Sequence, residues 1–168
     1  ALSKLNKANI RLLAQHMTGG RYQVVSKFKK IPSSVLLGTY GLWEGIDVPG
    51  ESLSTVVIAK LPFVPPHDPV IDALAEASNK DPFIDFALPK MILRLRQGVG
   101  RLIRSTSDYG TLVICDSRFL YADYGNQVLS SLPPAHIHIG SLRDLLPTLT
   151  DWFGQDTLDR CKKQPASF

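Results

Sequence analysis

The pattern of hydrophobic and polar positions alternates along the chain between short apolar runs and longer amphipathic segments. Apolar runs of about four to eight residues are typical of buried strands, and apolar residues three and four positions apart are typical of helices. The pattern predicts strands over residues 10–15, 34–38, 53–61, 111–115 and 135–139. It predicts helices over residues 2–9, 21–30, 126–131 and 141–153, a helical turn over 41–46 and a long helix that begins near residue 89. This alternation predicts an α/β fold with a parallel sheet.

Residues 62–89 are expected to form an irregular helical insertion, because six prolines interrupt them. Asp68-Pro69 and Asp81-Pro82 each place an N-cap carboxylate before a proline at the first helical position, so two short helices should start there. The helix over residues 21–30 is expected to bury one face, made of Tyr22, Val25 and Phe28. The strand over residues 53–61 is continuously apolar, which predicts burial on both faces.

The long helix carries the most informative pattern, because its two sides differ sharply. At about 100° per residue, its apolar residues fall on one side and should be buried: Leu95, Val99, Leu102 and Ile103. The opposite side is a polar stripe: Lys90, Arg94, Gln97, Arg101 and Arg104. Two arginines one turn apart form a clamp for a phosphate-like anion, whereas the simpler alternative is a solvated basic face. Gly100 costs about 1 kcal/mol against alanine inside a helix, which indicates that another group approaches the backbone there.

A second polar segment precedes the arginines in the sequence. The apolar run at 34–38 stops at Gly38-Thr39, and the segment from Gly38 to Gly50 contains four glycines, a proline and two acids, Glu44 and Asp47. A buried parallel strand that ends in such a loop is typical of a functional site.

A basic patch is a weaker candidate, and its members gather on the helix over residues 21–30: Arg21, Lys27, Lys29 and Lys30. This patch has two interpretations: it contacts single-stranded DNA, or it is simply a solvated helix face.

Composition adds few constraints to this picture. The chain has 168 residues, a formal net charge of +4 and a pI near 9.1, which permits an anionic partner without requiring one. Its two cysteines, Cys115 and Cys161, predict neither a disulfide nor a metal site, and they suggest a reducing, cytosolic setting. No apolar run approaches about 20 residues, so no membrane span is expected. We expect one domain over residues 1–160 and a tail over residues 161–168.

Together, W-E-G-I-D-V-P-G at residues 43–50 and Q-G-V-G-R-L-I-R at residues 97–104, followed by Asp116-Ser117-Arg118, resemble motifs V and VI of superfamily 2 helicases. The wording is similar to the DinG/XPD branch in particular, and the resemblance covers residues 1–135. It implies a RecA-like fold, with a parallel sheet and helices on both faces, that serves as the second motor domain of an ATP-dependent DNA helicase. Such a domain normally opens with a further strand, which would lie before Ala1. A DNA-repair role in the bacterial cytoplasm, at the nucleoid, is also implied.

The resemblance assigns roles to individual residues. Three residues would contact the phosphates of ATP, the arginines as fingers that neutralise developing charge: Arg104, Arg101 and Gln97. Four would lie beside the nucleotide: Asp47, Gly45, Glu44 and Gly100. Gly38 and Thr39 would contact phosphates of single-stranded DNA, as the basic patch would through Arg21. Asp47 has a simpler alternative as a turn residue, and Glu44 as a helix cap. Arg101, Arg104 and Asp47 are expected at the carboxyl ends of strands.

The chain contains only half of such a nucleotide site. It has no Gly-Lys pair, hence no P-loop, and no D-E-x-H box to hold Mg²⁺. In the family the first motor domain of the same polypeptide supplies these groups, so ATP and Mg²⁺ would be bound mainly there, and the isolated chain is expected to be inactive. Some members carry an iron–sulfur cluster in the first motor domain or an exonuclease-like domain, both outside this chain.

The sequence leaves two alternatives to a helicase domain. The stronger one is a non-catalytic nucleic-acid-binding scaffold domain with a degenerate motor. A Rossmann-type enzyme is disfavoured, because the G-x-G at residues 98–100 lies in a helix and does not follow a strand.

Overall fold

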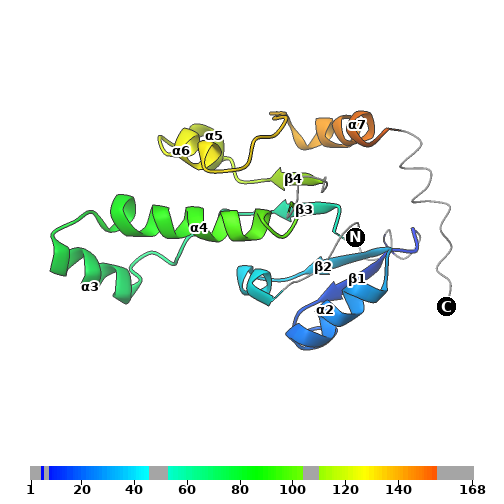
Figure 1. Ribbon diagram of the computed structural model, residues 1–168, viewed down its shortest axis with the longest axis horizontal. Coiled ribbons are helices and arrows are strands. Elements are labelled where there is room, and N and C mark those ends of the chain that lie inside the picture. Colours follow the sequence, from blue (N-terminus) through cyan, green and yellow to red (C-terminus); the bar gives the residue numbers. More distant parts are fainter. Residues whose placement is uncertain (1–4, 6–7, 46–52, 104–109, 155–168) are drawn as a thin grey trace. The chain divides into compact units, whose positions relative to one another are not determined.

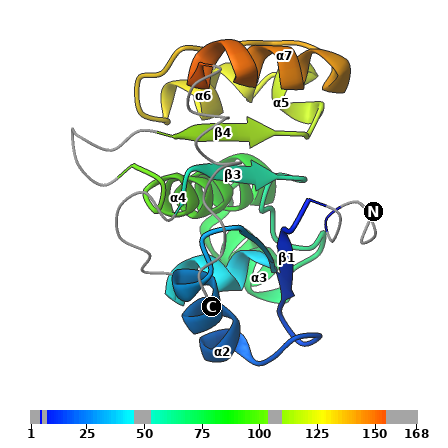
Figure 2. The ribbon, with the colours of Figure 1, turned by 90° about the vertical axis from the view of Figure 1, so that its right-hand side faces the viewer.

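Two pairs of parallel strands form the framework of the first part of the chain. β1 (Arg11–Ala14) pairs with β2 (Ser34–Leu37), and β3 (Thr55–Ile58) pairs with β4 (Thr111–Ile114) (Figure 1). Figure 2 shows the β3–β4 pair from a second direction. The structure, a computed structural model, describes residues 5, 8–45, 53–103 and 110–154, without the side chains of residues 43–45. It divides into two compact units, residues 1–132 and 133–168, and each is considered by itself.

Both strand pairs are parallel, as the sequence predicts, because a helical crossover joins the two members of each pair. Among the described residues, β2 and β3 are not hydrogen-bonded to each other. The prediction that β3 is buried on both faces is only partly confirmed, since Ile58 is buried but Val57 is 62% exposed.

Helices connect the strands of this unit. Their bounds are α2 (Arg21–Lys30), α3 (Pro69–Ser78), α4 (Leu88–Val99), α5 (Arg118–Tyr121) and α6 (Gly125–Ser130), with a 3₁₀ helix η1 (Tyr40–Gly45) and a π-helical segment η3 (Pro82–Ala87). The helix predicted over residues 2–9 falls largely outside the described residues. None of the described helices is long and apolar enough to cross a membrane.

The two Asp-Pro pairs begin helices as predicted. The carboxylate of Asp68 accepts the N–H groups of Val70 and Ile71 at the start of α3. Asp81 accepts the N–H groups of Phe83 and Ile84 at the start of η3, which leads directly into α4. These bonds satisfy backbone donors that have no partner inside the first helical turn.

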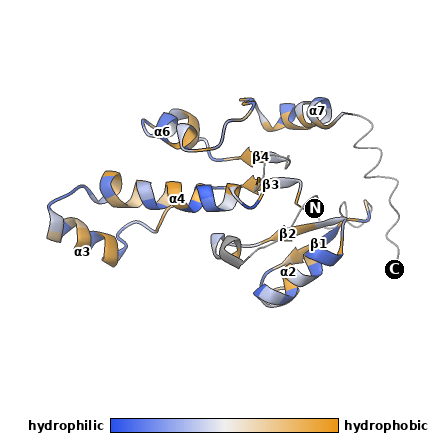
Figure 3. Ribbon diagram, in the orientation of Figure 1, coloured by the Kyte–Doolittle hydropathy of each residue, from blue (hydrophilic) through white to orange (hydrophobic). Residues whose placement is uncertain are grey.

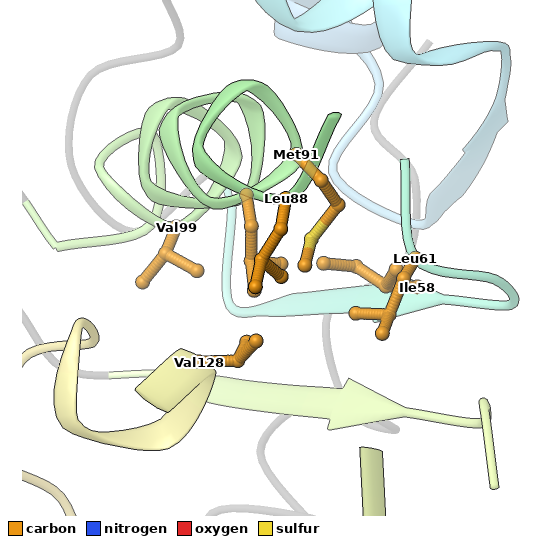
Figure 4. Close-up of a cluster of buried hydrophobic side chains, with 7 residues drawn as sticks. Ile58, Leu61, Leu88, Met91, Val99 and Val128 are labelled. Atoms are coloured by element: carbon orange, nitrogen blue, oxygen red, sulfur yellow. The ribbon is translucent and has the colours of Figure 1, made fainter. Parts of the chain in front are cut away.

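The main core lies between α4 and the β3–β4 pair (Figure 4). Its buried members come from β3, α4, α6 and the segment after β3: Ile58, Leu61, Leu88, Met91, Leu95, Val99 and Val128. Figure 3 shows the alternation of apolar and polar residues along α4 that produces this one-sided burial. The predicted buried side of the helix is confirmed, since Leu95, Val99 and Leu102 are buried.

A smaller core lies between α2, β2 and η1 and contains Val24, Val25 and Leu42. The prediction that Tyr22 faces the core is wrong, because its side chain is 84% exposed. The buried face of α2 is centred on Val24 and Val25, and Tyr22 lies about 200° from Val24 around the helix.

Gly100 is the C-cap of α4 and does not lie inside the helix as predicted. Its backbone (φ −62°, ψ −8°) leads into a looser turn, in which the N–H of Arg101 donates to Gly98 O at 3.2 Å and that of Leu102 to Val99 O at 2.9 Å. A Cβ at residue 100 would lie 3.2 Å from Arg96 O. The glycine therefore relieves crowding where the helix ends, and no outside group is needed to explain it.

The second unit contains α7 (Leu142–Phe153) and the segment before it. Ser141 and Asp144 form a reciprocal capping box at its start, where the sequence predicts that this helix begins. The strand predicted over residues 135–139 is wrong: these residues form no ladder, and Ile137 and Ile139 are exposed. A strand needs a neighbouring strand to hydrogen-bond with, and the described part of this unit offers none.

Candidate nucleotide and nucleic-acid interface

The two polar segments identified in the sequence belong to opposite ends of strands. Gly38 and Thr39 follow the carboxyl end of β2, whereas α4 runs antiparallel to β3 and β4 and ends near their amino ends (Figure 1). A Cβ added to Gly110, just before β4, would lie 2.5 Å from Leu102 Cδ1 and 2.9 Å from Ser54 O, just before β3. Leu102 is the neighbour of Arg101, so the expectation that Arg101 lies at carboxyl ends of strands is wrong. A helix that links two parallel strands must return toward the start of the second one.

The candidate nucleotide contacts are only partly described. Gln97 and Gly100 are exposed, and Arg101 is half-buried in the turn after α4. Arg104 and Asp47 lie outside the described residues. Glu44 and Gly45 end η1, but of their surroundings the structure describes nothing. The roles assigned to these residues therefore stay predictions.

Gly38 is required by close packing at the carboxyl end of β2. A Cβ at this position would lie 2.7 Å from Leu42 Cδ1 and 3.2 Å from Leu42 Cβ, so any side chain here would displace the buried Leu42 from the strand end. Thr39 is exposed, and its carbonyl accepts the N–H of Leu42 at 2.9 Å. The segment is thus held in place by η1, with the Thr39 side chain facing solvent.

Arg94 joins the two candidate segments, which the sequence did not reveal. Its Nη1 donates to Pro62 O at 3.2 Å, its Nη2 lies 3.4 Å from the Tyr40 hydroxyl, and its Cζ lies 4.2 Å from the centre of the Tyr40 ring. Tyr40 begins η1, directly after Thr39. Arg94 is therefore not part of a solvated stripe, because it connects α4 to the loop that follows β2.

The basic patch of α2 is partly used inside the fold. Arg21 is half-buried, and its Nε is buried without a hydrogen-bond partner among the described residues. Lys27 donates to Thr18 O at 3.2 Å across the start of the helix. Lys29 and Lys30 are exposed in the last turn, where positive charge is favourable to the helix dipole.

Asp116 connects the carboxyl ends of β3 and β4. Its Oδ2 accepts the N–H of Leu61 at 2.9 Å and Nη2 of Arg118 at 2.6 Å, while Oδ1 accepts Nε of Arg118 at 3.0 Å. These bonds, chiefly those from the Arg118 side chain, lower the pKa of Asp116 to about 2. The Arg118 guanidinium also lies 5.3 Å from the centre of the Phe63 ring. Asp116, paired with Arg118, therefore connects the segments that follow the two strands.

The comparison with known proteins decides the family. Residues 1–135 match the helicase C-terminal domain family. The chain belongs to this family. The RecA-like α/β fold expected from the resemblance is confirmed with it, and parallel strand pairs linked by helices agree with that fold.

Named relatives are bacterial. The chain is 42% identical over 137 residues to the 3'-5' exonuclease DinG of Bacillus subtilis, which covers 79% of this chain and 15% of that protein. It is 46% identical over 116 residues to the ATP-dependent DNA helicase YoaA of Escherichia coli, and this match covers 67% of this chain and 18% of that protein. It is 41% identical over 114 residues to the ATP-dependent helicase DinG of Mycobacterium tuberculosis, and this match covers 66% of this chain and 17% of that protein. The chain thus spans less than a fifth of the length of these relatives.

The described residues contain no group of three or more His, Cys, Asp or Glu side chains able to hold a metal. Two cysteines in the whole sequence are also too few for a four-cysteine cluster. Guanidinium and amide groups, by contrast, donate to phosphate.

Asp116→Asn should lower the free energy of unfolding at pH 7 by about 1–2 kcal/mol. The folded-state pKa of about 2 lies below the ordinary value of 3.8, so the stability from ionised Asp116 is present above about pH 4 and is lost as the pH falls toward 2. Urea unfolding at pH 7, 4, 3 and 2 should show the difference between the two proteins shrinking over the acidic range. A difference that stays constant from pH 7 to pH 2 would contradict this role.

Arg94→Ala should destabilise the chain by about 1–2 kcal/mol, because it removes the stacking on Tyr40 and the bond to Pro62 O. Arg96→Ala is the matched control: Arg96 is exposed on the same helix, and its loss should change the stability by less than about 0.5 kcal/mol. Hydrogen exchange should also speed up at the amide of Leu42 in Arg94→Ala alone. Equal behaviour of the two variants would show that the Arg94 contacts do not hold η1.

Proposed function

We propose that the chain is the second motor domain of an ATP-dependent DNA helicase and works with a first motor domain of the same polypeptide. The first domain would bind ATP and Mg²⁺, which this chain has no P-loop to hold. This domain would complete the site with Arg104, Arg101 and Gln97, and would contact single-stranded DNA through Gly38, Thr39 and Arg21. The activity would place the parent protein on DNA in the bacterial cytoplasm.

One observation supports the proposal beyond family membership: the start of η1, which leads into the first motif-like segment, touches helix α4, which leads into the second. η1, which continues the Gly38-Thr39 loop, packs against α4 through Tyr40 and Arg94. Tyr40 and Arg94 are 54 positions apart in the sequence. This contact supports a domain in which the loop that carries the proposed nucleic-acid contacts Gly38 and Thr39 is linked to the helix that carries Gln97.

The chemistry proposed for the arginines is electrostatic. As the γ-phosphoryl group transfers to water, negative charge shifts onto its oxygens and the leaving group. A guanidinium held by the second domain neutralises that charge only when the two domains close. Closure and reopening then change the spacing between the two sets of DNA contacts, which moves the protein along the strand. Asp47, Gly45, Glu44 and Gly100 would border the nucleotide in the closed state.

The test is Arg104→Ala in the longer protein that carries this domain. The maximal rate of DNA-stimulated ATP hydrolysis should fall by about 10³-fold or more, by analogy with other arginine fingers. Affinity for single-stranded DNA should stay almost unchanged, and Arg104→Lys should restore little, because an ammonium group lacks the fork geometry. Arg96→Ala serves as the control and should leave the rate near normal.

The opposite result would overturn the assignment. If Arg104→Ala weakens DNA binding while the DNA-saturated rate of hydrolysis survives, Arg104 is a DNA contact. If the parent protein binds DNA but hydrolyses no ATP with or without the substitution, the domain is a nucleic-acid-binding scaffold with a degenerate motor.

A further inference from the structure

An open pocket of about 300 Å³ lies at the carboxyl ends of β3 and β4. It is lined by the residues that directly follow the two strands: Ala59, Lys60, Cys115, Asp116, Ser117 and Arg118. In open α/β sheets, ligands bind outside the carboxyl ends of the strands. None of these residues belongs to the set proposed above for ATP or DNA, so the pocket needs its own explanation.

The lining offers hydrogen-bond donors that the fold leaves unused. Lys60 and Ser117 are exposed, and within the described part of the chain neither their side chains nor their backbone N–H groups donate to a protein acceptor. Arg118 gives Nε and Nη2 to Asp116, which leaves Nη1 without a partner among the described residues. Unused donors that converge on one pocket favour an anion with several acceptor oxygens.

The acceptor in the lining does not compete for that anion. Both oxygens of Asp116 are engaged by Leu61 and Arg118, so this carboxylate orients the guanidinium. The positive charges of Lys60 and Arg118 and the negative charge of Asp116 together leave the pocket with one net positive charge. A single phosphodiester group, with one negative charge, matches this balance better than a polyphosphate does.

We propose that the pocket formed by Lys60, Ser117 and Arg118 binds a backbone phosphate of single-stranded nucleic acid. The inference rests on the proposed function and adds a contact site to it. The pocket lies at the carboxyl ends of β3 and β4, whereas Arg101 lies near their amino ends. Nucleic acid bound here would therefore lie at the opposite end of β3 and β4 from the turn that contains Arg101. Nucleotide phosphate is the other source of the same chemistry, and the experiment separates the two.

Cys115 provides a direct probe, because it is an exposed free thiol in the pocket lining. In a Cys161→Ser variant of the 168-residue chain, the rate of Cys115 labelling by dithionitrobenzoate reports access to the pocket. Oligothymidylate at saturating concentration should slow labelling several-fold, while ATP or inorganic phosphate at the same phosphate concentration should not. Fluorescence anisotropy of labelled oligothymidylate gives the affinity in parallel.

Lys60→Ala tests the contact itself. It should weaken oligothymidylate binding several-fold, abolish most of the protection of Cys115, and reduce the slope of log affinity against log salt by about 0.7, the value for one phosphate on a single strand. Lys80→Ala is the matched control, since Lys80 is an exposed lysine outside the pocket and should leave all three readouts unchanged. Ser117→Ala should reduce protection without altering the salt slope.

The outcomes separate the two proposals. Oligothymidylate that binds without slowing Cys115 labelling, or with equal affinity for Lys60→Ala and Lys80→Ala, overturns the pocket and leaves the proposed function standing. Protection by ATP alone assigns the pocket to a nucleotide and also overturns the inference. No binding of oligothymidylate at any salt concentration overturns the DNA contacts of the proposed function together with the pocket.

Discussion

Helix α4 has to run antiparallel to the strands that it connects, and the positions of the arginine turn and of the Lys60–Arg118 pocket depend on that constraint. After α3 and η3, the helix returns along the strand pair, buries Leu88, Met91, Leu95 and Val99 against it, and ends near the amino end of β4. The turn with Arg101 therefore lies at one edge of the β3–β4 pair and the Lys60–Arg118 pocket at the other. One helix thus separates a candidate nucleotide contact from a candidate nucleic-acid contact.

Polar contacts hold the segments at the carboxyl ends in place. Asp116 ties the residues after β4 to the backbone after β3 through Leu61, and Arg94 ties α4 to both Pro62 and Tyr40. Each of these contacts involves a charged group, and Asp116 is almost fully shielded from water, with 6% of its side chain exposed. Such bonds are stronger than those between neutral groups and fix geometry as well as adding stability. The Arg94 contacts link the loop after β2 to the helix before the arginine turn.

Features that depend on residues close together in the sequence could be predicted from it, whereas features that depend on distant residues could not. The caps at Asp68 and Asp81 and the buried side of α4 are local, so spacing alone identifies them. Gly100 was misplaced because the sequence does not reveal where a helix stops when its polar stripe continues past its end. The strand expected over residues 135–139 failed because strand formation depends on a partner elsewhere in the chain.

The contacts of Arg94 and Asp116 join residues 54 and 55 positions apart, and no local pattern encodes them. The sequence did reveal the family, because two motifs in the right order are specific. Arg104 and Asp47 lie outside the described residues, so their roles stay predictions.

The central claim is that this domain holds one half of a composite ATP site. Steady-state ATP hydrolysis by the purified 168-residue chain, with and without single-stranded DNA, tests that claim most directly. The account predicts no turnover above background in either condition, because the chain has no P-loop and no carboxylate box for Mg²⁺. Turnover well above background that persists in Arg104→Ala would contradict it.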